Sequence, residues 1–164
     1  LVTVGRVSAE KGQDMIPAVT RRLLDEGHPV RWYVIGDGDM RPRVEQLCRG
    51  QGVENSVFLL GTRTNPYCYM KSCDIYVQPS YTEGYSTTIC EAGILGKAIV
   101  GTKPSGGIYD QITHGEDGLI VDATVDGLTE GIRILVENTT LRRQFEKNIQ
   151  KCIKKLMLGM DLFV

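Results

Sequence analysis

Short apolar runs and longer stretches with helical spacing alternate along the chain. The runs are rich in β-branched residues and lie at residues 1–4, 31–35, 57–60, 74–78, 97–101 and 118–121. Between and after them, apolar residues recur at intervals of three and four, which predicts amphipathic helices. The predicted helical faces comprise Met15, Ile16, Val19, Leu23 and Leu24; Val44, Leu47 and Cys48; Leu128, Ile132, Leu135 and Val136; and Leu141, Phe145, Ile149, Cys152, Ile153 and Leu156.

The alternation predicts an α/β fold. Strands that are apolar almost throughout are buried on both faces, as in a parallel sheet covered by helices. Right-handed crossovers then give an open, doubly wound, Rossmann-like parallel sheet of about six strands. A length of 164 residues suits one such domain, so residues 1–164 are predicted to form a single domain. Ligands of such sheets bind beyond the carboxyl ends of the strands, and candidate chemistry is sought there.

Composition and charge argue against several classes of protein. The formal net charge is −1 and no long charge run occurs, so a nucleic-acid partner is not expected. No apolar stretch is long enough to suggest a membrane span. The cysteines form no C-x-x-C pair and match no zinc spacing, so no metal site is predicted. Unpaired thiols fit a reducing, cytoplasmic setting. They are Cys48, Cys68, Cys73, Cys90 and Cys152.

The loop after the first run carries two cations. It reads GRVSAEKG, in which Gly5 allows a tight turn before Arg6 and Lys11. Arginine offers a fork of donors and lysine a point charge, so the two suit a diphosphate.

The loop after the second run, GDGDM, lacks the third glycine of the dinucleotide fingerprint and the closing carboxylate of a calcium loop. Its glycines are expected to let backbone segments approach closely.

The loop after the fourth run, PSYTEGYSTTICEAG, contains two glutamates. A helix is predicted to open in TTICEAGIL, where Thr88 and Glu91 have the spacing of a capping box. The N–H groups of a helix start favour an anion, so the amides from Tyr85 to Thr88 are expected to meet a phosphorylated ligand. Glu91 is placed to accept hydrogen bonds from a diol. Glu83 lies in the turn, and no local structural motif accounts for it.

The loop after the fifth run adds a second turn that suits an anion. Ser105, Gly106 and Gly107 precede another short helix in TKPSGGIYDQI. Small residues in such a turn allow successive N–H groups to face a phosphate. Three loops with small residues and cations at one sheet edge together predict a phosphate-bearing ligand.

Taken in order, these motifs resemble a known family. VGRVSAEKG, VIGDGDM, VFLLGTR, PSYTEGYSTTICEAGILGKAIVGT, SGG followed by the acid Asp110, and GEDGLIV occur at family-like spacing. The chain resembles the C-terminal, nucleotide-sugar-binding half of retaining glycosyltransferases with the two-domain GT-B fold. The particular group is the glycosyl transferases group 1 family (family 4). The resemblance covers about residues 1–150 and depends on the ordered set rather than on one motif.

The resemblance implies roles for matching positions. Arg6 and Lys11 match the pair that grips the nucleotide diphosphate, Glu91 the residue that binds the ribose hydroxyls, and Glu83 the residue beside the donor sugar. Glu83, Arg6 and Lys11 are the implied catalytic residues, and Glu83 is not assigned as a covalent nucleophile. The implied substrate-binding residues are Gly5, Gly61, Thr62, Arg63, Gly84, Tyr85, Ser86, Thr87, Thr88, Glu91, Gly106 and Gly107, with 61–63 expected near the base.

The resemblance also implies partners and a setting. The donor is a nucleoside-diphosphate sugar, with UDP favoured over GDP, and no metal or other cofactor is expected. A sugar, lipid-linked or protein acceptor is bound in this fold mainly by an N-terminal domain that is absent from this chain. Alone, the chain is expected to bind donor weakly and to be almost inactive. The whole enzyme is expected in cell-surface polysaccharide or glycolipid synthesis, in the cytoplasm or peripherally on the inner face of the membrane.

The sequence departs from the family pattern at two positions. Ser86 stands where the family often has glycine, and a side chain there is expected to narrow the pocket. Asp110 stands where the acid after the Gly–Gly turn is usually glutamate. The departure at Ser86 affects which donor the pocket would accept.

Two other classes of function stay open from the sequence. A non-catalytic nucleotide- or phosphate-binding module would share the alternation of strands and helices. Another GT-B relative, such as a nucleotide-sugar epimerase or a phosphorylase, would share the fold. A response-regulator receiver is disfavoured, because GRVS and GTRT stand where it needs an acidic cluster and a phospho-accepting aspartate.

Overall fold

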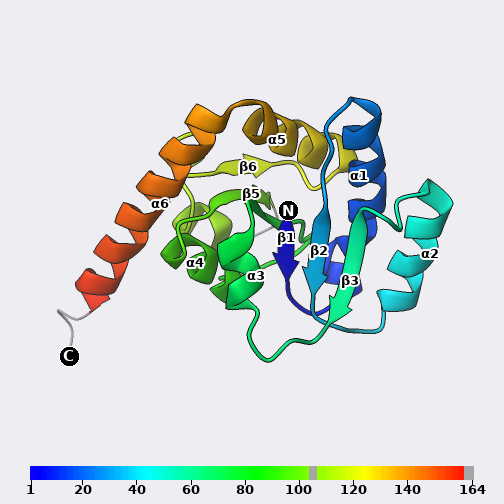
Figure 1. Ribbon diagram of the computed structural model, residues 1–164. Coiled ribbons are helices and arrows are strands. Elements are labelled where there is room, and N and C mark those ends of the chain that lie inside the picture. Colours follow the sequence, from blue (N-terminus) through cyan, green and yellow to red (C-terminus); the bar gives the residue numbers. More distant parts are fainter. Residues whose placement is uncertain (104–106, 161–164) are drawn as a thin grey trace.

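A computed structural model of the chain describes residues 1–103 and 107–160, with side chains as far as residue 153. Within these residues, the strands β1 (Val2–Val4), β2 (Trp32–Ile35), β3 (Val57–Gly61), β4 (Ile75–Gln78), β5 (Ala98–Thr102) and β6 (Leu119–Val121) form one sheet. Every neighbouring pair is parallel, and the order is β3-β2-β1-β4-β5-β6 (Figure 1). The predicted strands are confirmed, each boundary to within one residue.

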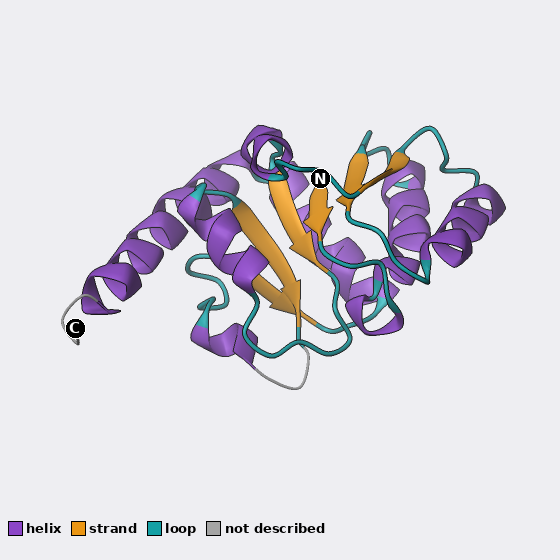
Figure 2. Cartoon of the chain, turned by 90° about the horizontal axis from the view of Figure 1, so that it is seen from below, coloured by secondary structure: helices purple, strands orange, loops and turns teal. Residues whose placement is uncertain are grey.

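Helices connect the strands and lie on both sides of the sheet (Figure 2). The α-helices are α1 (Ile16–Asp25), α2 (Arg41–Gln51), α3 (Tyr67–Ser72), α4 (Thr87–Ile94), α5 (Val125–Glu137) and α6 (Thr139–Met160). Short 3₁₀ helices are η1 (Ala9–Lys11), η2 (Gln13–Met15) and η3 (Gly107–Asp110). The helices predicted from apolar spacing are present. Helix α3 was not predicted, because its sequence YCYMKS buries only Met70 and so shows no apolar period.

The sheet separates two apolar layers. On one face, α1, α2 and α5 pack around Trp32, whose indole N–H donates to Thr3 Oγ1 at 3.0 Å. On the other face, α3 and α4 pack around Tyr76. Burial of each large apolar side chain contributes about 1.5–3 kcal/mol, so both layers hold the short strands in register.

Helix α6 contributes to both layers. Phe145 packs with α1 and α5, whereas Ile149 and Ile153 pack with α4. Gly93 of α4 makes room for this contact, since a Cβ there would stand 2.8 Å from Ile153 Cγ1. The helix therefore ties the two faces together beside β5 and β6 (Figure 1).

The chain reverses its direction of winding between β1 and β4. From β1 it proceeds through β2 to β3 on one side, and from β4 through β5 to β6 on the other. The loops that follow β1 and β4 therefore leave the sheet at its carboxyl edge, at the point where the winding reverses. Sheets of this kind bind ligands at that point.

Candidate functional site at the carboxyl edge of the sheet

The loops after β1 and β4 are joined through their backbones. The N–H groups of Tyr81 and Thr82 both donate to the carbonyl of Glu10, at 2.9 and 3.2 Å. Gly12 has φ 66°, and a Cβ there would stand 2.0 Å from the Pro79 carbonyl oxygen. Glycine alone tolerates both this conformation and this contact. One small residue thus lets the two loops lie side by side.

This contact brings Lys11 to Glu83. Lys11 Nζ donates to both carboxylate oxygens of Glu83, at 2.8 and 3.0 Å. The two side chains are only 23% and 13% exposed, so solvent screens the pair less than it screens a surface pair. Charge-assisted hydrogen bonds of this kind are about twice as strong as neutral ones. Two of the predicted catalytic residues therefore form one unit.

A buried polar network supports Glu83. Its Oε2 also accepts from Gln78 Nε2 at 3.0 Å and from Ser80 Oγ at 3.1 Å. The Gln78 Oε1 accepts from Tyr76 OH at 2.8 Å and from Thr88 Oγ1 at 3.2 Å. Burial raises the pKa of the Tyr76 phenol, which therefore stays a neutral donor. Gln78 was not among the predicted site residues, although it is visible in the sequence as the polar residue that ends the apolar run DIYVQ.

Helix α4 begins after Ser86. The Ser86 hydroxyl accepts from the Ile89 N–H at 3.4 Å, and Ser86 has the extended backbone that an N-cap needs. The predicted capping box of Thr88 and Glu91 is therefore wrong, because both residues lie inside the helix. Ser86 is 4% exposed, and its hydroxyl lies against the first turn of the helix. That its side chain narrows the donor pocket stays a prediction.

The start of α4 offers two backbone N–H groups. Those of Thr87 and Thr88 have no hydrogen-bond partner within the described part of the chain. The Ser86 N–H, which is predicted to face a ligand, instead donates to Gln111 Oε1 at 2.9 Å. Free N–H groups at a helix start carry the positive end of the helix dipole and favour an anion. Beside them, Gly84 and Tyr85 are exposed.

Gln111 is a second residue that sequence reasoning missed. Its amide engages both backbone groups of Ser86, accepting from the N–H at 2.9 Å and donating to the carbonyl at 2.7 Å. Gln111 follows η3 and is 1% exposed, so it ties the segment after β5 to the start of α4. Gly107 allows the same approach, since a Cβ there would stand 2.7 Å from the Gly84 carbonyl oxygen. Gly106, the other predicted glycine, lies outside the described residues.

Glu91 meets Tyr67 across α3 and α4. Tyr67 OH donates to Glu91 Oε1 at 3.0 Å. The bond to the carboxylate raises the pKa of the Tyr67 phenol, so the phenol keeps its proton and remains a donor. Glu91 Oε2 has no partner among the residues that the structure describes. This oxygen remains able to accept a hydrogen bond from a ligand.

Arg6 lies apart from Lys11. Its side chain is 72% exposed, and its guanidinium lies 3.7 Å from Glu10 Oε1. The sequence predicts that Arg6 and Lys11 act together on a diphosphate, but here Lys11 faces Glu83 and Arg6 faces solvent. The turn itself is as expected: Gly5 has φ 154°, and a Cβ on Gly36 would stand 1.9 Å from the Gly5 carbonyl oxygen.

The residues predicted near the base follow β3. Gly61 has φ 70°, and its carbonyl accepts from the Gly36 N–H at 3.0 Å. Thr62 and Arg63 are exposed at the carboxyl end of the strand. The structure thus places 61–63 at the same edge of the sheet as the loops after β1 and β4 (Figure 1).

The described residues contain neither a metal-binding cluster nor a membrane-spanning helix. No group of three or more His, Cys, Asp or Glu side chains there is arranged to hold a metal ion. No helix in that part of the chain is both long enough and apolar enough to cross a membrane.

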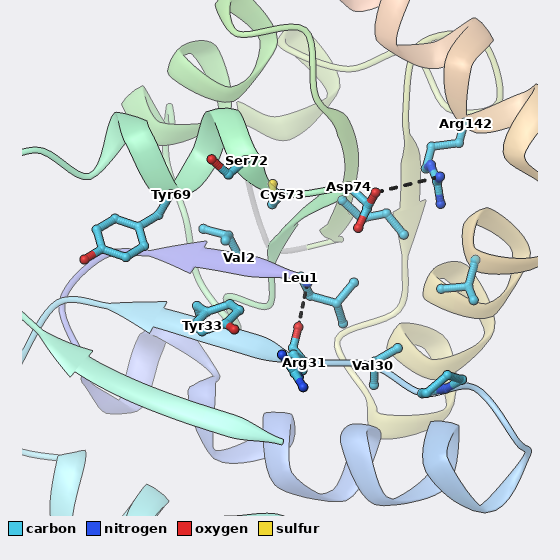
Figure 3. A pocket seen from close by; sticks show the side chains of 13 residues that line it. Leu1, Val2, Val30, Arg31, Tyr33, Tyr69, Ser72, Cys73, Asp74 and Arg142 are labelled. Atoms are coloured by element: carbon cyan, nitrogen blue, oxygen red, sulfur yellow. Dashed lines mark hydrogen bonds and ion pairs between the residues drawn. The ribbon is translucent and has the colours of Figure 1, made fainter. Parts of the chain in front are cut away.

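A cavity of about 800 Å³ lies at the opposite edge of the sheet. It is lined at the start of β1, β2 and β4 by Leu1, Arg31 and Asp74, with Arg142 of α6 facing Asp74 (Figure 3). None of the predicted site residues lines it. The residues predicted to be catalytic therefore lie at the other edge of the sheet, outside this cavity.

Comparison with known proteins places the chain in a family. The model of the glycosyl transferases group 1 family matches residues 1–152, and the chain belongs to that family. A 2-deoxystreptamine N-acetyl-D-glucosaminyltransferase of Niallia circulans is 29% identical over 140 residues, which is 83% of this chain and 36% of that protein. An N-acetylgalactosaminyltransferase of Campylobacter jejuni, whose name specifies a diphospho-undecaprenol-linked acceptor, is 25% identical over 98% of this chain and 44% of its own length.

Solved structures agree on the fold. The HepE protein of Anabaena in complex with UDP has a TM-score of 0.86 at 25% identity, over 94% of this chain and 43% of its own. The C-terminal domain of LpcC from Francisella tularensis has the same fold, with a TM-score of 0.83 at 19% identity and coverage of 94% and 84%. The six-stranded sheet thus matches that of GT-B glycosyltransferases. The chain spans less than half the length of the two transferases and of HepE.

Proposed function

We propose that this chain is the donor-binding domain of a glycosyltransferase that uses a nucleoside-diphosphate sugar. The observation that carries the proposal is the grouping of three features beyond the carboxyl ends of β1 and β4. These are the Lys11–Glu83 pair, the N–H groups at the start of α4 and the Oε2 oxygen of Glu91, the last two without a partner among the described residues. Family membership and the likeness to UDP-bound HepE support it.

The diphosphate is assigned to the start of α4. There the N–H groups of Thr87 and Thr88 donate to its oxygens, and the exposed Arg6 closes on it from the neighbouring loop. Lys11 shares its ammonium group between Glu83 and the phosphate. Donors held in place in this way stabilise the charge that develops on the leaving nucleoside diphosphate. Loss of one of them is expected to cost about 10²–10³ in rate.

The nucleoside and the donor sugar are assigned to opposite sides of the diphosphate. Glu91 Oε2 accepts from the ribose hydroxyls, and 61–63 lie beside the base. UDP is the favoured nucleotide, because HepE is complexed with UDP. Glu83, held by Lys11 and Gln78, accepts from hydroxyls of the donor sugar.

The reaction of the whole enzyme is proposed as sugar transfer with retention of configuration and without a metal. The acceptor is bound by an N-terminal domain, and the setting is cell-surface polysaccharide or glycolipid synthesis at the inner face of the membrane. The Campylobacter relative, whose name specifies an undecaprenol-linked acceptor, supports that setting. On this proposal the present chain alone binds donor weakly and transfers little.

Calorimetric titration tests the donor site. We expect UDP to bind this chain better than GDP, ADP or inorganic phosphate, and the variants Arg6→Ala and Glu91→Ala to lose about tenfold or more in affinity. Arg143→Ala, at an exposed arginine of α6 next to Arg142 of the cavity at the opposite edge, is the matched control and should keep the wild-type affinity. Equal binding of UDP by wild type and Glu91→Ala would contradict the assignment of the ribose to Glu91.

The stereochemistry requires the full-length enzyme. The enzyme is incubated with UDP-sugar and acceptor, with and without a metal chelator. We expect it to form a glycoside in both cases, and we expect NMR of the anomeric proton to show the same configuration as in the donor. Inverted product would contradict retention. Release of free sugar without transfer would favour an epimerase-like relative instead.

A further inference from the structure

One oxygen of Glu91 is already occupied in the structure. Tyr67 OH donates to Oε1 at 3.0 Å, and Oε2 has no partner among the described residues. A glutamate side chain has three rotatable bonds, and a single hydrogen bond from a fixed donor removes much of that freedom. The carboxylate is therefore held with one defined oxygen directed away from Tyr67.

Tyr67 is itself held in place. It is the first residue of α3, and its N–H donates to Asn65 Oδ1 at 3.1 Å. The helix is anchored by Met70, which is fully buried against the layer that contains α4. The phenol thus approaches Glu91 from an element that both the backbone and the core position.

The other exposed tyrosines at this edge make different contacts. Tyr81 OH donates to Asp14 at 3.2 Å, and Tyr85 OH lies 3.4 Å from Cys90 Sγ. Tyr109 has no hydroxyl partner among the described residues. Tyr67 is the tyrosine of this group that touches a carboxylate assigned to the donor site.

We propose that Tyr67 is a positioning residue that orients Glu91 toward the ribose diol of the donor. By occupying Oε1 it leaves Oε2 as the acceptor for a ribose hydroxyl, and so it sharpens the preference for a nucleotide that carries that diol. The inference rests on the proposed donor site. Residues 64–66 separate Tyr67 from the segment 61–63 that is assigned to the base.

The test compares two nucleotides on matched variants. UDP and its 2′,3′-dideoxy analogue are titrated into wild type, Tyr67→Phe and Tyr69→Phe. Tyr69 lies on the same helix but lines the cavity at the opposite edge (Figure 3), and its hydroxyl has no partner among the described residues. We expect Tyr67→Phe to weaken UDP about tenfold and to leave the dideoxy analogue unchanged. Tyr69→Phe should change neither.

The outcomes separate this inference from the proposed function. If Glu91→Ala weakens UDP but Tyr67→Phe does not, the donor site stands and the positioning role of Tyr67 is overturned. If Tyr67→Phe weakens both nucleotides equally, its effect is structural, and the inference is again overturned. If wild type binds no UDP, the proposed function and this inference both fail. In a Glu91→Ala background, Tyr67→Phe should add no further loss, since the group it positions is gone.

Discussion

At the residue scale, Lys11 and Glu83 neutralise each other in the protein without ligand. They are 72 positions apart, and each was predicted to be functional, yet their pairing follows from the fold alone. Glu83 accepts from three donors, which fix the orientation of its carboxylate. In the proposed function, Lys11 shares its charge between this carboxylate and the phosphate of the donor.

Removal of Lys11 should destabilise the fold more than removal of a surface cation. Lys11→Met leaves a half-buried carboxylate without its counter-ion, and we expect the free energy of unfolding to fall by about 1–3 kcal/mol. Arg21→Met, which breaks the exposed pair with Asp25, should cost less than about 0.5 kcal/mol. Urea denaturation of both variants measures this, and equal losses would contradict the role of burial.

The thiols should differ in reactivity with iodoacetamide at pH 8. Burial raises the pKa of Cys48 and of Cys73 to about 11, so little reactive thiolate exists there at that pH. Cys68 is exposed. Mass mapping of the folded chain should find Cys68 alkylated before Cys48 and Cys73, and denaturant should remove the difference. Early alkylation of Cys48 in the folded chain would contradict its burial.

At the element scale, the start of α4 shows what a local pattern can and cannot predict. The helix was predicted from TTICEAGIL, but its cap was assigned two residues too late, because serine and threonine both cap and the stretch Ser86–Thr88 offers three candidates. The backbone decides among them: Ser86 is extended, and Gln111 holds it so from another loop. A contact between segments that are far apart in the sequence, such as that of Gln111 with Ser86, cannot be predicted from the local sequence pattern.

Substitution of the cap tests the assignment of the helix start. Ser86→Ala should lower the free energy of unfolding by about 1 kcal/mol, which is about 2–4 °C in Tm for a domain of this size. Thr87→Ala, at the next position on the exposed side, should stay within about 0.5 kcal/mol. A larger loss at Thr87 than at Ser86 would mean that the helix begins elsewhere.

Two glycines with the same backbone conformation allow the cost of backbone strain to be distinguished from the cost of a steric clash. Gly12 and Gly52 have φ 66° and 62°, but a Cβ would meet Pro79 at 2.0 Å only at Gly12 and nothing within 4 Å at Gly52. Gly52→Ala should cost about 1–2 kcal/mol from strain alone. Gly12→Ala should cost more and separate the loops after β1 and β4. Thermal unfolding of the two variants measures these costs. Equal losses of stability would contradict the close contact between Gly12 and Pro79.

At the scale of the whole molecule, much of the architecture could be predicted. Apolar runs bounded by turns locate all six strands, because a parallel sheet buried on both faces requires them. Helix α3 could not be predicted, since one buried residue gives no period, and Tyr67 was missed with it. The topology of the sheet predicts that the carboxyl edge is the functional edge. The local sequence pattern does not predict which residues meet at that edge. An example is the hydrogen bond from Gln78 to Glu83, which depends on the packing of the whole fold.

A crystal structure of this chain with UDP would show directly where the nucleotide binds. We predict the diphosphate at the N–H groups of Thr87 and Thr88, beside Arg6 and Lys11, with the ribose on Glu91. We also predict that the cavity beside Leu1 and Asp74 stays free of nucleotide. UDP bound in that cavity, or at the carboxyl edge with its diphosphate away from α4, would contradict the proposed donor site.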